Sequence, residues 1–310
     1  MRSLFLCALF YLLVSVRGGG GSKGASEEKG AERLRSEISA DGGVEPLLES
    51  ELRDALKDIL AVLQHGSDAS KEGALERLVE LAVHTGEAGR EQAVAFRVAI
   101  VAGGALPPVV KALSSESTRR QHLGATALHA LALDDPSTQD DNDHQLEICK
   151  AGAVPPLVRM LSAAEPGVQH AATGALSALA ENPACQAMIA AEGAVAPLLD
   201  MASYGSDMQK LGALGALEVL QVNYAEVRTQ LQANGLAETL NGIASMGSPL
   251  LRGEAATFGA RLIDSSAPPQ KLSPSAHVKV ARETRARYDG VRHRAFRMMQ
   301  GWGAAESPTH

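Results

Sequence analysis

The sequence predicts an all-α protein, a right-handed α-solenoid of about four to five three-helix repeats. The first basis is a recurring segment whose glycines, Gly104, Gly152, Gly193 and Gly235, are spaced by 48, 41 and 42 residues. A period of roughly 40–47 residues is typical of helical repeat proteins. The second basis is composition, since aromatic residues make up only 3% of the chain. A core built from alanine, leucine and valine favours closely packed helices over a β-sandwich or barrel.

Each copy of the repeat predicts the same three helices. A short helix ends at the glycine in IVAGGALPPVVKAL (100–113), ICKAGAVPPLVRML (148–161) and IAAEGAVAPLLDMA (189–202), because glycine tolerates the left-handed conformation at a helix end. A weaker copy runs over 231–244. Pro107, Pro155 and Pro197 fit the first turn of a second helix.

The third helix of each copy carries small residues and leucines at helical spacing. These helices are expected over 121–132, 169–180 and 209–220, where alanine and glycine allow close approach and leucine completes an apolar stripe. One unit cannot bury that stripe by itself, so neighbouring units are expected to stack.

The segments AGAVPPLV (151–158) and GALSALAENP (174–183) resemble the armadillo repeat family. The resemblance covers about 52–263 and includes a degenerate first unit that pairs 52–64 with 72–82. It implies armadillo-type repeats whose third helices line a concave face. HEAT repeats are the alternative, but the early glycine and the missing Asp/Arg ladder favour armadillo.

The remaining chain predicts three further segments around a solenoid at 51–265. Residues 1–18 are expected to be a signal peptide, because Arg2 precedes thirteen mostly apolar residues from Leu4 to Val16 and a glycine run follows. Thirteen helical residues span about 20 Å, less than a bilayer core of about 30 Å; an uncleaved signal anchor is the alternative. A polar linker at 19–50 and a basic tail at 266–310 complete the chain.

The signal peptide predicts localisation in the secretory pathway, in the endoplasmic reticulum lumen or outside the cell. The last four residues, 307–310, do not form a retention signal. Cys149 and Cys185 remain once Cys7 leaves with the signal peptide, and they occupy different registers of the repeat. We therefore expect two buried free thiols.

Charge is unevenly distributed along the chain. Residues 19–270 hold 19 basic and 33 acidic residues, a net of −14, whereas residues 271–297 hold eight basic and two acidic residues, a net of +6. The body is expected to repel nucleic acid. In the tail an apolar stripe includes Ala281, Thr284 and Tyr288, with arginines around it. This helix is expected to cap the last repeat; the alternative is contact of residues 271–302 with an anionic membrane.

Nothing in the sequence supports an enzyme, a cofactor or a metal site. The formal matches to G-x-S-x-G and G-x-G-x-x-G fall in the glycine run at 19–24, where no strand leads into a helix. His122 and His129 are seven residues apart, but no carboxylate or thiol completes a zinc set at helical spacing. The remaining function is the binding of a protein partner, an extended peptide or a folded domain, by a monomeric scaffold.

The armadillo resemblance places partner-binding residues on the third helices. Nuclear-import adaptors of similar fold hold basic peptides with tryptophan and asparagine ladders, which are missing here. Recognition of nuclear-localisation peptides is therefore not expected. The candidate protein-binding residues are His122, Thr126, His129, Ala130, His170, Gly174, Ser177, Ala178, Gly215, Glu218 and Val219; the alternative is that several of them only fill space between repeats.

A second resemblance implies a different function. KEGALERLVELA (71–82) followed by VAGGALPPVVKAL (101–113) is similar to the start of armadillo-type nucleotide-exchange factors of lumenal heat-shock chaperones. The acidic Asn-Ala signature usual between these blocks is replaced by HTGEAGREQAVAF (84–96). The resemblance implies a co-chaperone that speeds ADP release.

Overall fold

The computed structural model describes residues 44–82, 90–133, 144–222, 224–264, 276, 278–288 and 290. All regular secondary structure in these ranges is α-helical, as predicted. The predicted signal peptide lies outside the described residues, as does most of the linker. The chain divides into two compact units, residues 1–61 and 62–310. Within the described ranges, no helix combines the length and the apolar character needed to cross a membrane.

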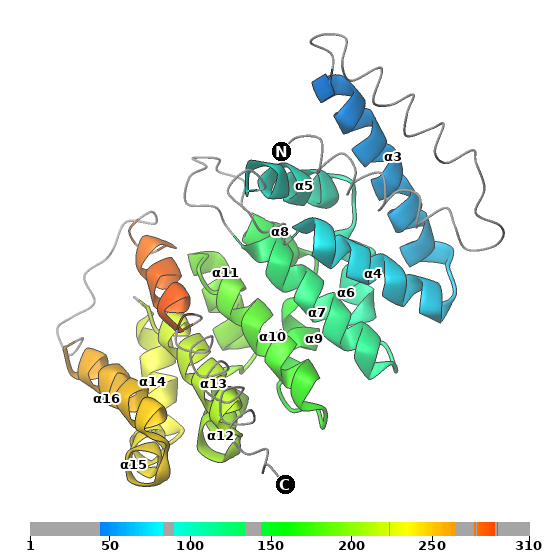
Figure 1. The fold of residues 1–310 in the computed structure, drawn as a ribbon. Helices are drawn as coiled ribbons and strands as arrows, with labels where there is room; N and C mark the ends of the chain where they lie inside the picture. The colour runs from blue at the N-terminus through cyan, green and yellow to red at the C-terminus, as the bar shows by residue number, and fades with distance from the viewer. Residues whose placement is uncertain are drawn as a thin grey trace, which may run out of the picture. The chain divides into compact units, whose positions relative to one another are not determined.

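The helices follow the predicted order of the repeat (Figure 1). The N-terminal helices are α3 (Val44–His65), which begins inside the predicted linker, and α4 (Asp68–Ala82). Three-helix units then follow: α5 (Arg90–Ala102), α6 (Leu106–Ala112) and α7 (Thr118–Ala132); α8 (His144–Lys150), α9 (Val154–Met160) and α10 (Pro166–Leu179); α11 (Pro183–Ala191), α12 (Val195–Tyr204) and α13 (Asp207–Leu220); α14 (Ala225–Ala233), α15 (Leu236–Met246) and α16 (Pro249–Asp264).

The repeating glycines end the first helices as predicted. Gly104, Gly152, Gly193 and Gly235 have φ between 81° and 85°, in the left-handed region. In three of the four turns the amide after the glycine donates to the carbonyl five residues earlier, as from Ala153 to Ile148 over 3.4 Å. This bond belongs to the Schellman motif, which satisfies a carbonyl at the helix end. Any other residue there would be strained by about 1–2 kcal/mol.

The third helices form the centre of the stack. Contacts join α4 to α7, α7 to α10, α10 to α13 and α13 to α16, and Figure 1 shows α7, α10 and α13 side by side in this order. The predicted leucine stripe is buried: Leu128, Leu131, Leu176, Leu179, Leu217 and Leu220 are at most 1% exposed. Every residue from 171 to 180 is buried too, because alanine and glycine bring the neighbouring helices close.

A buried glutamine joins two helices of the third complete unit. Gln186 of α11 is 1% exposed, and its Nε2 donates to the carbonyls of Val219, Leu220 and Val222 over 2.7–3.1 Å. These carbonyls lie at the C-terminal end of α13, where a helix lacks its own donors. The side chain therefore caps α13 from another helix.

Replacing Gln186 with leucine, which keeps most of the volume, removes this donor. We expect the free energy of unfolding to fall by about 1–3 kcal/mol, the cost of leaving buried polar groups unpaired. The urea midpoint followed by circular dichroism measures the change. Gln232→Leu, at an exposed position of α14, is the control; equal midpoints for the two variants would contradict the capping role.

The two cysteines form a disulfide, so the prediction of free thiols is wrong. Cys149 of α8 and Cys185 of α11 are bonded, with their Cα atoms 6.0 Å apart. The sequence registers differ because Cys149 lies three residues before its glycine and Cys185 eight. The position of a residue relative to its repeat glycine does not determine how far its helix is shifted along the axis of the neighbouring helix. The first helices α8 and α11 pack on each other, and their shift brings the two positions together.

Candidate protein-binding site

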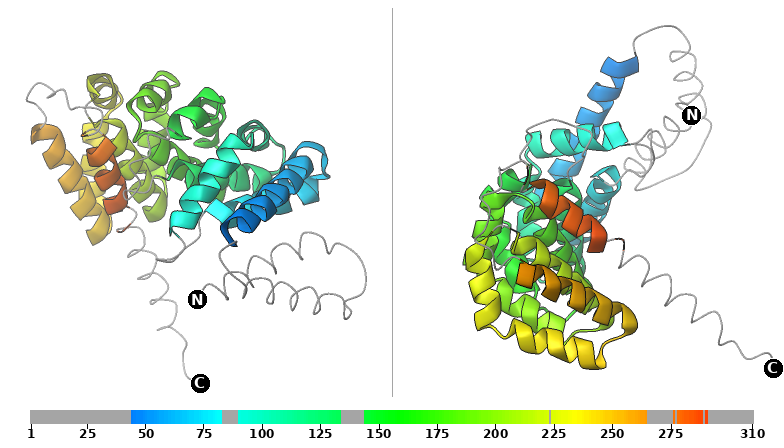
Figure 2. Two further views of the ribbon diagram at one scale, coloured as in Figure 1. Left: turned by 90° about the horizontal axis from the view of Figure 1, so that it is seen from above. Right: turned by 90° about the vertical axis from the view of Figure 1, so that its left-hand side faces the viewer.

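A helix of the C-terminal tail lies on the third helices. This tail helix comprises the described residues 276, 278–288 and 290, and it is drawn in orange-red in Figures 1 and 2. Its Ala281, Thr284 and Tyr288, part of the predicted stripe, are buried. Its contacts reach α13, α16 and the turn after α10. The tail helix thus covers third helices from more than one repeat, which differs from the expected cap on the last repeat.

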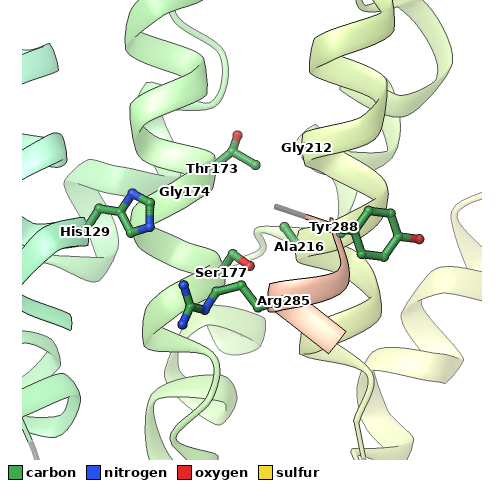
Figure 3. Close-up of a pocket in the computed structure, with 9 residues that line it drawn as sticks. His129, Thr173, Gly174, Ser177, Gly212, Ala216, Arg285 and Tyr288 are labelled. Carbon is green, nitrogen blue, oxygen red and sulfur yellow. The ribbon is translucent and has the colours of Figure 1, made fainter. Parts of the chain in front are cut away.

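Residues of the tail helix and of α7, α10 and α13 line a pocket (Figure 3). We call the face of the third helices that carries His129, Gly174, Gly215 and Glu254 the third-helix surface. Figure 3 shows Arg285 reaching toward α10 and Tyr288 lying against α13. The pocket is lined by His129, Thr173, Gly174, Ser177, Gly212, Gly215, Ala216, Arg285 and Tyr288.

Two glycines make room for the rings in this region. A Cβ atom on Gly215 would lie 2.8 Å from Cγ of Tyr288, and one on Gly174 would lie 3.0 Å from Nδ1 of His129. The Gly215 distance is too short for carbon atoms, and Cγ is held close to the backbone of the tail helix. Tyr288 can therefore sit on α13 only while position 215 is glycine.

Three carboxylates, one from each of three successive repeats, pair with arginines of the tail helix. Glu181, which follows α10, has no exposed side-chain surface and contacts Arg285 and, at 3.7 Å, Arg282. Glu218 of α13 is nearly as buried and contacts Arg287 and Arg261. Arg287 also donates to Glu254 of α16 over 2.6 Å. The Glu181 and Glu218 carboxylates are almost fully removed from water, so their charges are screened less than those of surface carboxylates.

The tyrosine between these charges stays neutral. Burial raises the pKa of Tyr288 above its ordinary value, and the nearby Glu218 carboxylate raises it further. The guanidinium carbon of Arg287 lies 4.3 Å from the centroid of the Tyr288 ring, within the range of a cation–π contact. Tyr288 therefore contributes a neutral, apolar body to the contact.

The structure brings five of the predicted site residues together. His129, Gly174, Ser177 and Gly215 line the pocket, and Glu218 pairs with the tail helix beside it. Ala130, Ala178 and Val219 are buried between helices, which fits the alternative that they fill space. Elsewhere on the third helices, the Nδ1 atom of His122 lies 3.0 Å from the Gly167 carbonyl, Thr126 donates to the His122 carbonyl, and His170 is exposed.

Sequence reasoning missed the parts of the site that depend on the tail. It did not place Arg285 or Tyr288 on the third helices, nor did it select Glu181 and Glu254. The opposite charges of body and tail were the available signal, together with the recurrence of glutamate at 181, 218 and 254, spaced by 37 and 36 residues. In the part of the chain that the structure describes, no group of three or more His, Cys, Asp or Glu residues could hold a metal ion.

Comparisons with known proteins agree with this architecture. Residues 141–181 match the family described as Armadillo/beta-catenin-like repeat. A search of curated proteins found no match.

Several solved structures are similar in fold. One is a designed armadillo repeat protein in complex with the peptide (KR)4, with a TM-score of 0.62 and 20% identity over 82% of this chain and 99% of that one. Another is the armadillo repeats only protein from Plasmodium falciparum, with a TM-score of 0.56 and 15% identity over 72% of this chain and 99% of that one. At such identities the likeness concerns the fold. The chain is an all-α solenoid with the armadillo-repeat fold.

Proposed function

We propose that this chain is a protein-binding scaffold of the secretory pathway that holds its partner on the third-helix surface. The observation that carries the proposal is that this surface already accommodates a helical segment, the chain's own tail. One buried tyrosine and the pairs between arginines and Glu181, Glu218 and Glu254 hold it there. A surface with this shape and charge suits a basic segment of another protein.

A solved structure of the same fold supports a basic partner. The designed armadillo protein described above was solved with a peptide of alternating lysine and arginine. In the present chain, the solenoid segment is acidic, with a net charge of −14 over 19–270. Complementary charge steers a basic partner toward an acidic surface and disfavours nucleic acid.

Two features support the secretory pathway. The N-terminal segment has the pattern of a signal peptide, and the Cys149–Cys185 disulfide is of the kind that persists in oxidising compartments. Nucleotide exchange on a lumenal chaperone stays a prediction of the sequence resemblance, as does a monomeric state. Contact of residues 271–302 with an anionic membrane also stays a prediction, and it would require the tail helix to leave the third helices.

Site-specific photo-crosslinking in the full chain tests the scaffold proposal. A benzophenone residue replaces His170, which is exposed and lies one helical turn before Gly174 on α10. The control position is Tyr204 on the second helix α12, 87% exposed. In secretory cells we expect a discrete adduct from position 170, about tenfold stronger than from 204, whose crosslinked peptide is rich in arginine or lysine. Equal adducts from both positions, or none from 170, would contradict the proposal.

A further inference from the structure

The tail helix makes contacts that a separate ligand could make. Its buried residues, Ala281, Thr284 and Tyr288, are spaced by three and four and so lie along one face of the helix. Arg282 and Arg285, three residues apart, both reach Glu181. Together these contacts come from residues 281–288, about two turns of helix, with arginines beside an apolar face.

The carboxylates on the receiving side belong to the repeats and not to the tail. Glu181 follows α10, Glu218 lies in α13 and Glu254 in α16, so the stacking of repeats fixes their spacing. Glu181 and Glu218 are almost fully buried beneath their arginine partners. A helix from another protein with arginines at matching positions would satisfy the same carboxylates.

We propose that the tail helix is an internal ligand of the third-helix surface, and that the partner carries an arginine-bearing amphipathic helix that displaces it. This inference rests on the proposed scaffold function and names both the chemistry of the partner and the regulation of its site. The tail keeps the acidic surface covered until such a helix competes for it.

Mass action sets the strength of this regulation. Eleven residues, 265–275, separate the last residue of α16 from the tail helix. A short connection gives the tail an effective concentration on the order of millimolar. If the open surface binds such a helix at about 10 μM, the attached tail weakens that binding about 100-fold.

The test uses the full chain and a fluorescent peptide of residues 276–290, AHVKVARETRARYDG, as probe. Its affinity is measured by anisotropy for the unaltered chain and for a tail variant that combines Arg285→Glu and Tyr288→Ala. We expect the tail variant to bind the probe at least about 30-fold more tightly, because the attached competitor has been removed. Binding should weaken as salt is raised.

Two substitutions in the repeats identify where the probe binds. In the tail variant, Gly215→Ala should abolish probe binding, because the added Cβ would lie only 2.8 Å from the position that Cγ of Tyr288 takes and would clash with the probe's tyrosine. Gly253→Ala on α16 is the matched control, since a Cβ there meets nothing within 4 Å, and it should leave the affinity unchanged. A probe with glutamate at the positions of Arg282, Arg285 and Arg287 should not bind.

Equal probe affinity for the unaltered chain and the tail variant would overturn the proposal, as would binding that is insensitive to Gly215→Ala. Circular dichroism checks that the variants fold, and Arg282→Glu with Arg285→Glu is a second tail variant that keeps Tyr288.

Failure of the scaffold proposal gives a different result. The probe would then bind the tail variant in a Gly215-dependent manner, but no partner would crosslink to position 170.

Discussion

Replacing Leu176 with alanine is expected to lower the free energy of unfolding by about 2–5 kcal/mol. Leu176 is fully buried in the last turn of α10, which packs on α7, α9 and α13. Its neighbours along α10 are mainly alanine and glycine, so the helix backbones already lie close and cannot move much further into a cavity. The variant should therefore lose the full transfer free energy of the removed atoms and also bear the cost of the remaining cavity. The denaturation midpoint followed by circular dichroism measures the loss.

The control for this prediction is Met246→Ala on α15. Met246 is 90% exposed, so its truncation should change the free energy of unfolding by no more than about 0.5 kcal/mol. Hydrogen exchange adds a spatial readout, because each repeat contacts only its neighbours. The loss of protection for Leu176→Ala should centre on α7, α10 and α13. A uniform loss along the chain, or none, would argue against the stack described above.

Removing the disulfide is expected to lower the free energy of unfolding by about 2–4 kcal/mol. The bond joins residues 36 apart in sequence, and it restricts the unfolded chain accordingly. The variant is Cys149→Ser with Cys185→Ser, compared with the unaltered chain in denaturant without reductant. With reductant present during unfolding, most of this difference should disappear.

Alkylation gives an independent check on the same bond. The unaltered chain, denatured without reductant, should gain no iodoacetamide at Cys149 or Cys185 when its peptides are mapped by mass spectrometry. Modification of both would mean that the two thiols are free, as the repeat pattern predicts. It would also remove one of the two features that support an oxidising compartment.

The repeat could be predicted from sequence because its determinants are local. A glycine at φ above 80°, a proline in the next helical turn and an alanine–leucine helix are each set by residues close in sequence. Their recurrence fixed the order of helices and placed His129, Gly174, Ser177 and Gly215 on one face. Those residues now line the pocket.

The docking of the tail could not be predicted in the same way. Arg285 lies more than one hundred residues beyond Glu181, and no periodic pattern links them. Their pairing depends on how far successive repeats are displaced in space, which the sequence does not state. The same limit explains the disulfide, since the register of Cys149 and Cys185 within their repeats hides their proximity.

Two of the glycines that line the pocket, Gly174 and Gly215, occupy equivalent positions in their repeats. Gly174 and Gly215 each lie nine residues after the N-cap residue of their helix, Glu165 and Ser206. Twelve residues after its own N-cap, α7 carries His129, whose ring lies over Gly174 of the next repeat. At the equivalent position, α10 carries the smaller Ser177, and α13 with Gly215 belongs to the repeat that follows. At the first junction the ring of His129 lies over Gly174, whereas at the second the ring of Tyr288, from the tail helix, lies over Gly215. Substitutions at the position of His129 and Ser177 could open or close successive junctions of a solenoid without altering its backbone.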